Sequence, residues 1–219
     1  MLKYLINLIF PPKCIFCNNI LELNSDIYIC KECFKNIPFI DSIQILRGTS
    51  DYYDDIVCIC EYSGIIRDAL VKFKFFNKPS YYKTFAKMLA IKIKETNWQE
   101  IDIIVGIPLY FEKEQKRGYN QSYLISKALS KELGVAEGTS FVTRVRDTGS
   151  QSLLAKNQRI SNIKDAFKVN VINGVNGKTI LLIDDILTTG STINECSKAL
   201  KQAGARKVIA AVVATGRKF

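Results

Sequence analysis

The chain has 219 residues with a formal net charge of +10, and 47% of the residues are apolar. That composition excludes a disordered chain and allows one domain of ordinary size with a small appendage. The chain contains no histidine, which excludes Ser-His and Cys-His nucleophile pairs and any metal site built on imidazole. The surplus of Lys and Arg favours a polyanionic partner such as nucleic acid, although a merely lysine-rich surface explains it equally well.

The amino-terminal segment, residues 1–13, contains a short apolar run that ends at Pro11 and Pro12. The run is too short to span a bilayer and lacks a small-residue cleavage site. We therefore expect a cytoplasmic protein in which this segment packs on the protein's own core. A weak contact with the inner face of the cytoplasmic membrane is the alternative.

Two C-x2-C pairs follow. Their thiols belong to Cys14, Cys17, Cys30 and Cys33. Paired thiolates at this spacing are typical of a closed, structural zinc site, and we expect a hairpin over residues 20–29 to bring the pairs together. Two disulfides are the alternative, which the absence of a signal peptide disfavours. Residues 1–40 would thus form a helix and a four-cysteine zinc knuckle.

Residues 41–219 are expected to form one α/β domain after a connector over residues 41–55. Strand-like apolar runs alternate there with segments of helical spacing. The expected strands cover residues 56–62, 101–107, 166–171, 179–183 and 208–214. The expected helices cover residues 63–74, 81–94, 122–133 and 191–203, and residues 142–157 are expected to be polar and irregular. Continuous apolar strands are typical of sheets covered on both faces, so we expect a doubly wound, mainly parallel sheet. The cysteines outside the knuckle, Cys58, Cys60 and Cys196, lack partner spacing, and Cys58 and Cys60 are expected to be buried apolar residues on one face of a strand.

The expected strand over residues 179–183 leads to Asp184 and Asp185 at the carboxyl edge of the sheet, where ligands of such folds bind. A turn that is rich in hydroxyls and contains Gly190 then enters a helix. Backbone N–H groups at such a turn suit a phosphate, and adjacent carboxylates suit a vicinal diol or Mg²⁺. This order of groups describes a phosphorylated ribose that carries a diphosphate. The alternative is that the acidic pair and one hydroxyl only cap the helix.

Several motifs together resemble the ComF family, which includes natural-competence proteins, within the type I phosphoribosyltransferases. They are LIFPPKCIFC over residues 8–17, LVKFKF over 70–75, IDIIVGIPL over 101–109, RGYNQ over 117–121 and IDDILTTGST over 183–192. The resemblance covers nearly the whole chain, and RGYNQ combined with the four-cysteine pattern is its most specific part. It implies a phosphoribosyltransferase-type α/β fold with a small amino-terminal unit that is similar to a zinc ribbon.

The resemblance also implies roles for individual residues. Asp184 and Asp185 would contact the ribose hydroxyls and, with Arg117, carry catalysis, and Mg²⁺ would bind together with phosphoribosyl diphosphate. The residues implied in binding phosphate and diphosphate are Gly106, Pro108, Leu109, Leu187, Thr188, Thr189, Gly190, Ser191 and Thr192. The candidates for a mobile loop or for nucleic-acid contacts are Lys72, Lys74, Lys116, Arg117, Asn120, Gln121, Arg144, Arg146 and Gln151.

Two functions follow from this resemblance. The first is a cytoplasmic competence protein that binds incoming single-stranded DNA, with a helicase-like ATPase and recombination proteins as partners. Basic and aromatic residues interleaved over residues 72–83 suit that function, although core packing is the alternative for Phe73, Phe76 and Tyr82. The second function is an active phosphoribosyltransferase that acts on an unknown nucleobase or nucleotide, for which no acceptor pocket is recognisable in the sequence.

Overall fold

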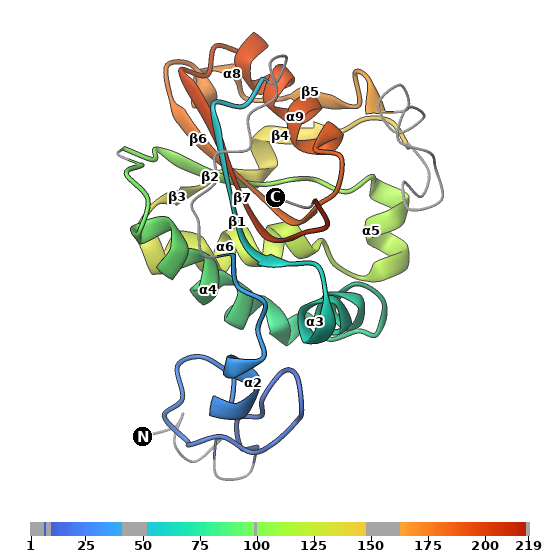
Figure 1. Ribbon diagram of the computed structural model, residues 1–219. Coiled ribbons are helices and arrows are strands. Elements are labelled where there is room, and N and C mark those ends of the chain that lie inside the picture. Colours follow the sequence, from blue (N-terminus) through green and yellow to red (C-terminus); the bar gives the residue numbers. More distant parts are fainter. Residues whose placement is uncertain (1–6, 8–9, 41–51, 99, 148–162, 218–219) are drawn as a thin grey trace.

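The computed structural model describes Asn7 and residues 10–40, 52–98, 100–147 and 163–217 (Figure 1). A larger α/β part makes up most of these residues. A small amino-terminal part lies at one end of it, below α3 and α4 in the view of Figure 1.

A five-stranded parallel sheet forms the centre of the larger part. Its strands are β1 (Asp55–Glu61), β2 (Ile103–Gly106), β3 (Ala136–Glu137), β6 (Thr179–Leu187) and β7 (Lys207–Thr215). The strand order is β1-β7-β6-β2-β3, and each pair of neighbours is parallel. β6 and β7 are largely apolar and buried along their length, because both of their faces are covered. The expected mainly parallel sheet is confirmed.

Helices cover both faces of this sheet, as in a doubly wound fold (Figure 1). One face carries α3 (Gly64–Phe75), the 3-10 turn η1 (Pro79–Tyr81), α4 (Tyr82–Lys94) and α6 (Gln121–Leu133). The other carries α9 (Ser191–Gln202) and an antiparallel pair, β4 (Val142–Arg144) with β5 (Phe167–Val169). The remaining short elements are α5 (Phe111–Arg117), η2 (Thr139–Phe141) and α8 (Ile172–Val175). Alternate residues of β6 divide between the two cores, since Leu181 and Ile183 pack under α3, α4 and α6, whereas Ile180 and Leu182 pack under α9.

The structure corrects three local expectations. The segment expected to be irregular from residue 142 begins with β4, which pairs with β5; its part from residue 148 lies outside the described residues. The strand expected to end at Ile183 continues to Leu187, because its last residues keep pairing with β7. The described backbone over residues 20–29 forms turns rather than a hairpin, with a single bridge from Ile20 to Lys13.

The amino-terminal part docks on the α4 side of the sheet. Its residues Ile15 and Ile37 are buried in the same core as α3 and α4. Lys87 of α4 also forms an ion pair with Asp26, with Nζ and Oδ1 3.4 Å apart. This part therefore shares its core with the larger domain. Most of the apolar run expected to pack on that core, and residues 41–51 of the expected connector, lie outside the described residues.

No helix among the described residues is long and apolar enough to cross a bilayer.

Candidate functional site

The two C-x2-C pairs converge on one point. The sulfur atoms of Cys14, Cys17, Cys30 and Cys33 all lie within 4.8 Å of one another. Cys30 also caps α2 (Lys31–Lys35), since its sulfur accepts a hydrogen bond from the backbone N–H of Cys33 at 3.4 Å. Burial acts to raise the pKa of Cys14, but backbone N–H groups of Cys17 and Cys30 outweigh it and lower that pKa to about 7. Four converging sulfurs are consistent with a structural zinc site that has no open position for a substrate.

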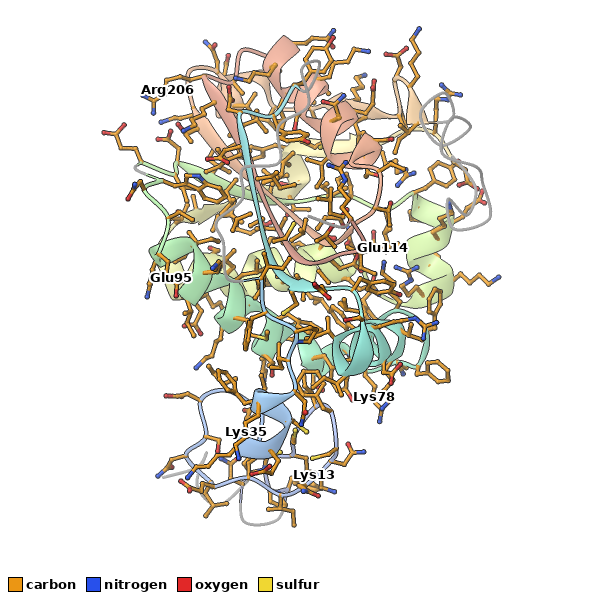
Figure 2. The ribbon with its side chains drawn as sticks, in the orientation of Figure 1. Lys13, Lys35, Lys78, Glu95, Glu114 and Arg206 are labelled. Carbon is orange, nitrogen blue, oxygen red and sulfur yellow. The ribbon has the colours of Figure 1, made fainter. Side chains whose placement is uncertain are left out.

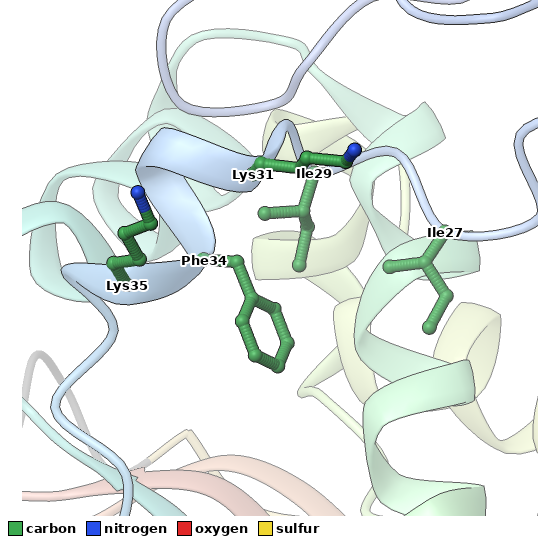
Figure 3. A pocket seen from close by; sticks show the side chains of 5 residues that line it. All are labelled: Ile27, Ile29, Lys31, Phe34 and Lys35. Carbon is green, nitrogen blue, oxygen red and sulfur yellow. The ribbon is translucent and has the colours of Figure 1, made fainter.

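An apolar hollow of about 380 Å³ lies on the same amino-terminal part (Figure 3). Ile27, Ile29 and Phe34 line it, and Lys31 and Lys35 flank it. All five belong to α2 or to the segment just before it. The lining includes none of the residues expected to bind ribose or phosphate, so the hollow is separate from the carboxyl edge of the sheet.

The two adjacent carboxylates of β6 lie where the sheet opens. Pairing between β2 and β6 ends at Gly106 and Ile183, whereas β6 stays paired with β7 as far as Leu187. Asp184 and Asp185 therefore lie just beyond the end of β2, at the edge where ligands of parallel sheets bind. Successive side chains of a strand alternate, so Asp185 points to the side of α3 and α6. Asp184 lies between the two faces, because it reaches Ser122 of α6 beyond the end of β2 and is also near Arg144 of β4.

Asp184 has partners on both faces of the sheet at this edge. Ser122 of α6 donates to Asp184 Oδ1 at 3.0 Å, and the backbone N–H of Asp185 donates to the same oxygen at 2.9 Å. Burial and the charge of Asp185 nevertheless raise the pKa of Asp184 to about 6, against the opposing effects of Lys74 and of these hydrogen bonds. Arg144 of β4 is near enough for its charge to act on Asp184, although burial lowers the pKa of Arg144. The carboxylate is thus incompletely compensated, as expected of a group that a ligand would satisfy.

Asp185 faces the side of α3 and α5, where it is only 5% exposed. Lys74, near the end of α3, forms an ion pair with it, with Nζ and Oδ1 2.9 Å apart. Arg117, the last residue of α5, is a second nearby cation: burial lowers its pKa, and the charges of Asp185 and Asp184 act to raise it. The Arg117 guanidinium also lies over the ring of Phe75, 5.5 Å from the ring centre. Lys74, expected as a nucleic-acid candidate, is therefore part of the carboxylate site.

The rest of the RGYNQ segment joins α6 to the end of α3. The Tyr119 hydroxyl and the Gln121 side-chain amide both donate to the backbone carbonyl of Phe73. Gln121 also accepts a hydrogen bond from Arg117. Asn120 caps α6 and donates to the carbonyl that follows β2, at 3.1 Å. Asn120 and Gln121 are 3% and 1% exposed, so their buried side chains position Arg117 and α3.

The turn from β6 into α9 brings hydroxyls to a helix start. Gly190 is the residue before α9 and has φ of 82°, a left-handed conformation that favours glycine. The hydroxyl oxygens of Thr189 and Ser191 lie 2.8 Å apart. Behind the turn, the Arg217 guanidinium donates to the backbone carbonyls of Thr188 and Thr189. A Cβ at Gly190 would lie 2.5 Å from Arg217 Nη2. The geometry suits a phosphate at the start of α9.

Close packing of α6 against the end of β2 requires glycine at position 106. A Cβ there would lie 2.5 Å from the backbone oxygen of Ser122, so only glycine lets α6 approach the strand this closely. The next residues complete the strand end, with Pro108 buried and Leu109 half-buried. These residues lie beside the carboxylates, and their role in holding a diphosphate stays a prediction.

The other candidates divide into three groups. Leu187 is buried in the core under α9, and Thr192 is half-buried in the first turn of α9. Among the described residues, Lys72, Lys116 and Arg146 make no ion pair with either carboxylate. Gln151 lies outside the described residues.

Sequence reasoning missed two residues of the site. Ser122, which donates to Asp184, directly follows the RGYNQ motif and could have been found as the first polar position of the expected helix. Arg217 follows the last buried strand, and only the parallel pairing of β7 with β6 brings it to the turn.

Comparisons with known proteins agree with this description. Residues 75–218 match the phosphoribosyl transferase domain family, and residues 5–44 match the double zinc ribbon domain family. Competence protein F of Haemophilus influenzae is 31% identical over 218 residues, which cover 91% of this chain and 95% of the relative. DNA utilization protein YhgH of Escherichia coli is 30% identical over 157 residues, which cover 70% and 68%. Competence protein ComFC of Bacillus subtilis is 24% identical over 177 residues, which cover 80% and 67%. The chain therefore belongs to the ComF family, in which a phosphoribosyltransferase-type domain follows a double zinc ribbon.

Proposed function

We propose that the carboxyl edge of the sheet binds phosphoribosyl diphosphate together with Mg²⁺. The observation that carries this proposal is the succession of Asp184, Asp185 and the hydroxyl-rich turn along one strand and the following helix start. Two carboxylates can accept hydrogen bonds from the two ribose hydroxyls, and the helix start can bind the 5-phosphate. The ion pair between Asp185 and Lys74 would open as a ribose hydroxyl enters.

The donor set fits Mg²⁺ that arrives with a diphosphate. This ion prefers oxygen ligands and is usually held by one or two carboxylates together with substrate phosphates. Asp184, with its pKa raised to about 6 by burial and by Asp185, is mostly ionised at neutral pH and would gain from a nearby cation. The ion would neutralise charge on the diphosphate. The contribution of the chain's own residues is to orient the ribose and to hold its phosphate.

A crystal structure of the protein with phosphoribosyl diphosphate and Mg²⁺ tests the binding. We expect the ribose between the two carboxylates and Thr189, with Lys74 turned away from Asp185. Ligand bound elsewhere, or no ligand at a saturating concentration, would contradict the proposal.

We further propose that the protein handles single-stranded DNA in the cytoplasm during natural transformation. The relatives that it resembles are named as competence and DNA utilization proteins. The net charge of +10 supports such a role, and so does the end of α3, where Phe75 and Phe76 are 69% and 64% exposed. Lys78 lies just beyond them (Figure 2). Lysines neutralise phosphates and exposed rings stack on bases.

The neighbouring aromatic residues do not belong to that surface. Phe73 is fully buried, and Tyr82 packs against the core under α3 and α4. In this proposal residues 1–40 serve as the zinc-stabilised unit and residues 41–219 carry both binding sites. A helicase-like ATPase and recombination proteins are the proposed partners.

Fluorescence anisotropy with a labelled oligothymidine at several salt concentrations tests the DNA part. We expect an affinity that falls steeply with salt, and a shallower salt slope when Lys72 and Lys78 are both changed to Gln. A matched control changes Lys13 and Lys35, on the amino-terminal part, to Gln (Figure 2). Binding that does not respond to salt, or equal losses in the two double variants, would rule out the α3 surface.

A phosphoribosyl transfer reaction is the second candidate, and the two partly buried guanidinium groups beside the carboxylates favour it. Arg117 and Arg144 are near enough for Asp184 to act on the pKa of each. Cations placed there would stabilise a leaving diphosphate, and that chemistry needs no histidine. Release of diphosphate from phosphoribosyl diphosphate and Mg²⁺, measured with a panel of nucleobases and nucleotides, tests this candidate. A protein that binds the ligand but releases no diphosphate would contradict it for those acceptors.

A further inference from the structure

The end of α3 carries an exposed aromatic ring directly beside the carboxylate site. We propose that the ring of Phe75, together with the Arg117 guanidinium that lies over it, is the binding surface for a nucleobase, the aromatic partner of the phosphoribosyl group. This inference rests on the proposed ribose site and adds to it the acceptor side, for which the sequence offers no pocket.

Arg117 links the two sites. Its guanidinium lies 5.5 Å from the centre of the Phe75 ring. The same guanidinium is close enough to Asp185 and Asp184 for both charges to act on it. Arg117 thus lies over the ring proposed to stack the base and near the carboxylates proposed to hold the ribose.

The position of Phe75 is fixed although its ring is 69% exposed. The preceding residue, Lys74, is held at the carboxylate site by its ion pair with Asp185 at 2.9 Å. The residue before that, Phe73, is fully buried, and its carbonyl accepts hydrogen bonds from Tyr119 and Gln121. The ring is thus presented to solvent by an immobilised backbone, which lowers the entropic cost of stacking a ligand on it.

The chemistry of this surface selects a class of ligand rather than one base. An aromatic face and a guanidinium plane both stack on purines and pyrimidines, because every base has a π-face. Phe75 and Arg117 offer a ring face and a delocalised cation, which suits any planar heterocycle. We therefore expect tolerance among bases, with larger rings binding more tightly.

Calorimetric titration with two probes, ribose 5-phosphate and adenosine 5′-monophosphate, isolates the contribution of the base. The wild-type protein should bind the nucleotide about tenfold more tightly than the sugar phosphate, since stacking on an aromatic side chain is worth about that much. Phe75→Leu should abolish this ratio and leave the affinity for ribose 5-phosphate unchanged. Phe75→Trp should keep the ratio or increase it. The matched control is Phe76→Leu, which removes an exposed ring from the same helix end and should leave the ratio as in the wild type.

The outcomes separate this inference from the proposed function. If neither probe binds, the ribose site itself is wrong. If both bind equally in the wild type, or if Phe75→Leu keeps the tenfold ratio, the ribose site stands and the base surface is overturned. A ratio that is lost equally in Phe75→Leu and Phe76→Leu would overturn the assignment to Phe75 and Arg117.

Discussion

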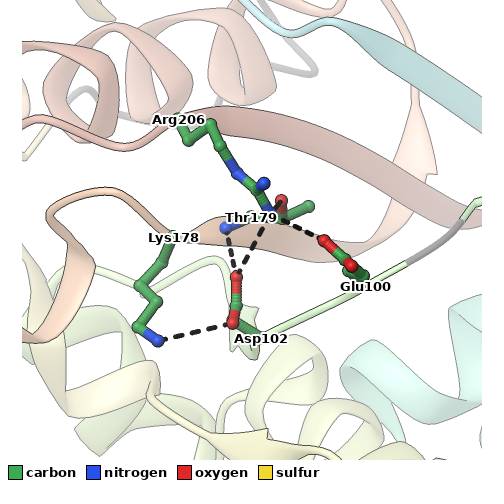
Figure 4. Close-up of polar contacts among 5 residues, drawn as sticks. All are labelled: Glu100, Asp102, Lys178, Thr179 and Arg206. Carbon is green, nitrogen blue, oxygen red and sulfur yellow. Dashed lines mark hydrogen bonds and ion pairs between the residues drawn. The ribbon is translucent and has the colours of Figure 1, made fainter.

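Carboxylates at the two ends of the central sheet have pKa values shifted in opposite directions. At the amino edge, Asp102 before β2 accepts from the backbone N–H of Thr179 at 2.7 Å and faces Lys178 and Arg206 at 3.4 Å and 3.8 Å (Figure 4). The Thr179 N–H and these two cations lower the pKa of Asp102. At the carboxyl edge, burial and a like charge raise the pKa of Asp184 to about 6.

This difference separates a structural site from a binding site. The amino-edge carboxylate joins three segments and is satisfied by the protein alone, so its charge stabilises the fold. The carboxyl-edge pair places two negative charges on successive residues of a buried strand, with Lys74 as the ion-paired cation. Such a pair lowers stability until a ligand or cation compensates it. Stability and binding should therefore respond oppositely to changes at the two edges.

The largest expected effect is on the pH dependence of stability. The pKa of Asp184 rises from 3.8 to about 6 on folding. The folded state thus holds a proton that the unfolded state has lost, so stability falls as pH rises through this window. Asp184→Asn removes this loss, and its stability relative to the wild type should increase by up to about 3 kcal/mol between pH 4 and pH 7, at 1.36 kcal/mol per pKa unit.

Urea unfolding at pH 4, 5, 6 and 7 measures this change. Both proteins carry the same four-cysteine centre, so its own proton linkage cancels in the difference. If the free energies of unfolding of the two proteins changed in parallel with pH, folding would not raise the pKa of Asp184.

The second effect separates binding at the two edges. Asp185→Asn should weaken the binding of phosphoribosyl diphosphate about a hundredfold, or about 2.7 kcal/mol, because it removes a charged acceptor for a ribose hydroxyl. Asp102→Asn, at the opposite edge, should leave the affinity unchanged. Titration calorimetry in Mg²⁺ compares the two variants. Equal losses in both would mean that the effect travels through the fold and that the carboxyl edge is not special.

The sequence allowed a prediction of the sheet but not of the side-chain contacts at its carboxyl edge. Continuous apolar runs predicted β6 and β7 because strands covered on both faces have no polar side. The same rule placed the end of β6 too early. It ended the strand before Asp184 and Asp185 because they are polar, whereas pairing with β7 continues to Leu187. The contact of Lys74 with Asp185 joins residues 111 positions apart in the sequence, and only the packing of α3 over the sheet brings them together. Short polar elements such as α5 and β4 gave no periodic signal of their own.

The third effect tests whether Lys74 compensates Asp185. Lys74→Met leaves a carboxylate that is 7% exposed without its ion-pair partner. The expected cost is about 2 kcal/mol, less than for a fully buried pair because the Lys74 side chain is 22% exposed. The pKa of Asp184 should rise further, since Lys74 now lowers it. Urea unfolding at pH 7 measures the cost. Lys74→Arg, the control, should retain most of the stability, and a loss as large as in Lys74→Met would point to packing rather than charge.

The smallest effect belongs to the compensated edge. Asp102→Asn should destabilise the fold by about 1 kcal/mol at neutral pH, since Asp102 is partly exposed and its ion pairs are screened by solvent. The pKa of Asp102 is lowered on folding, so its stabilising contribution is present above the ordinary carboxyl pKa and is lost as pH falls through the folded value. The difference between the variant and the wild type should therefore shrink on acidification, opposite in sign to the trend for Asp184→Asn.

Glu100→Gln, which removes a well-exposed carboxylate 3.4 Å from Arg206, is the matched control and should have almost no effect. If Glu100→Gln and Asp102→Asn were equally destabilising, any carboxylate near Arg206 would stabilise the fold to the same extent. The Thr179 N–H would then not be the main stabilising partner of Asp102.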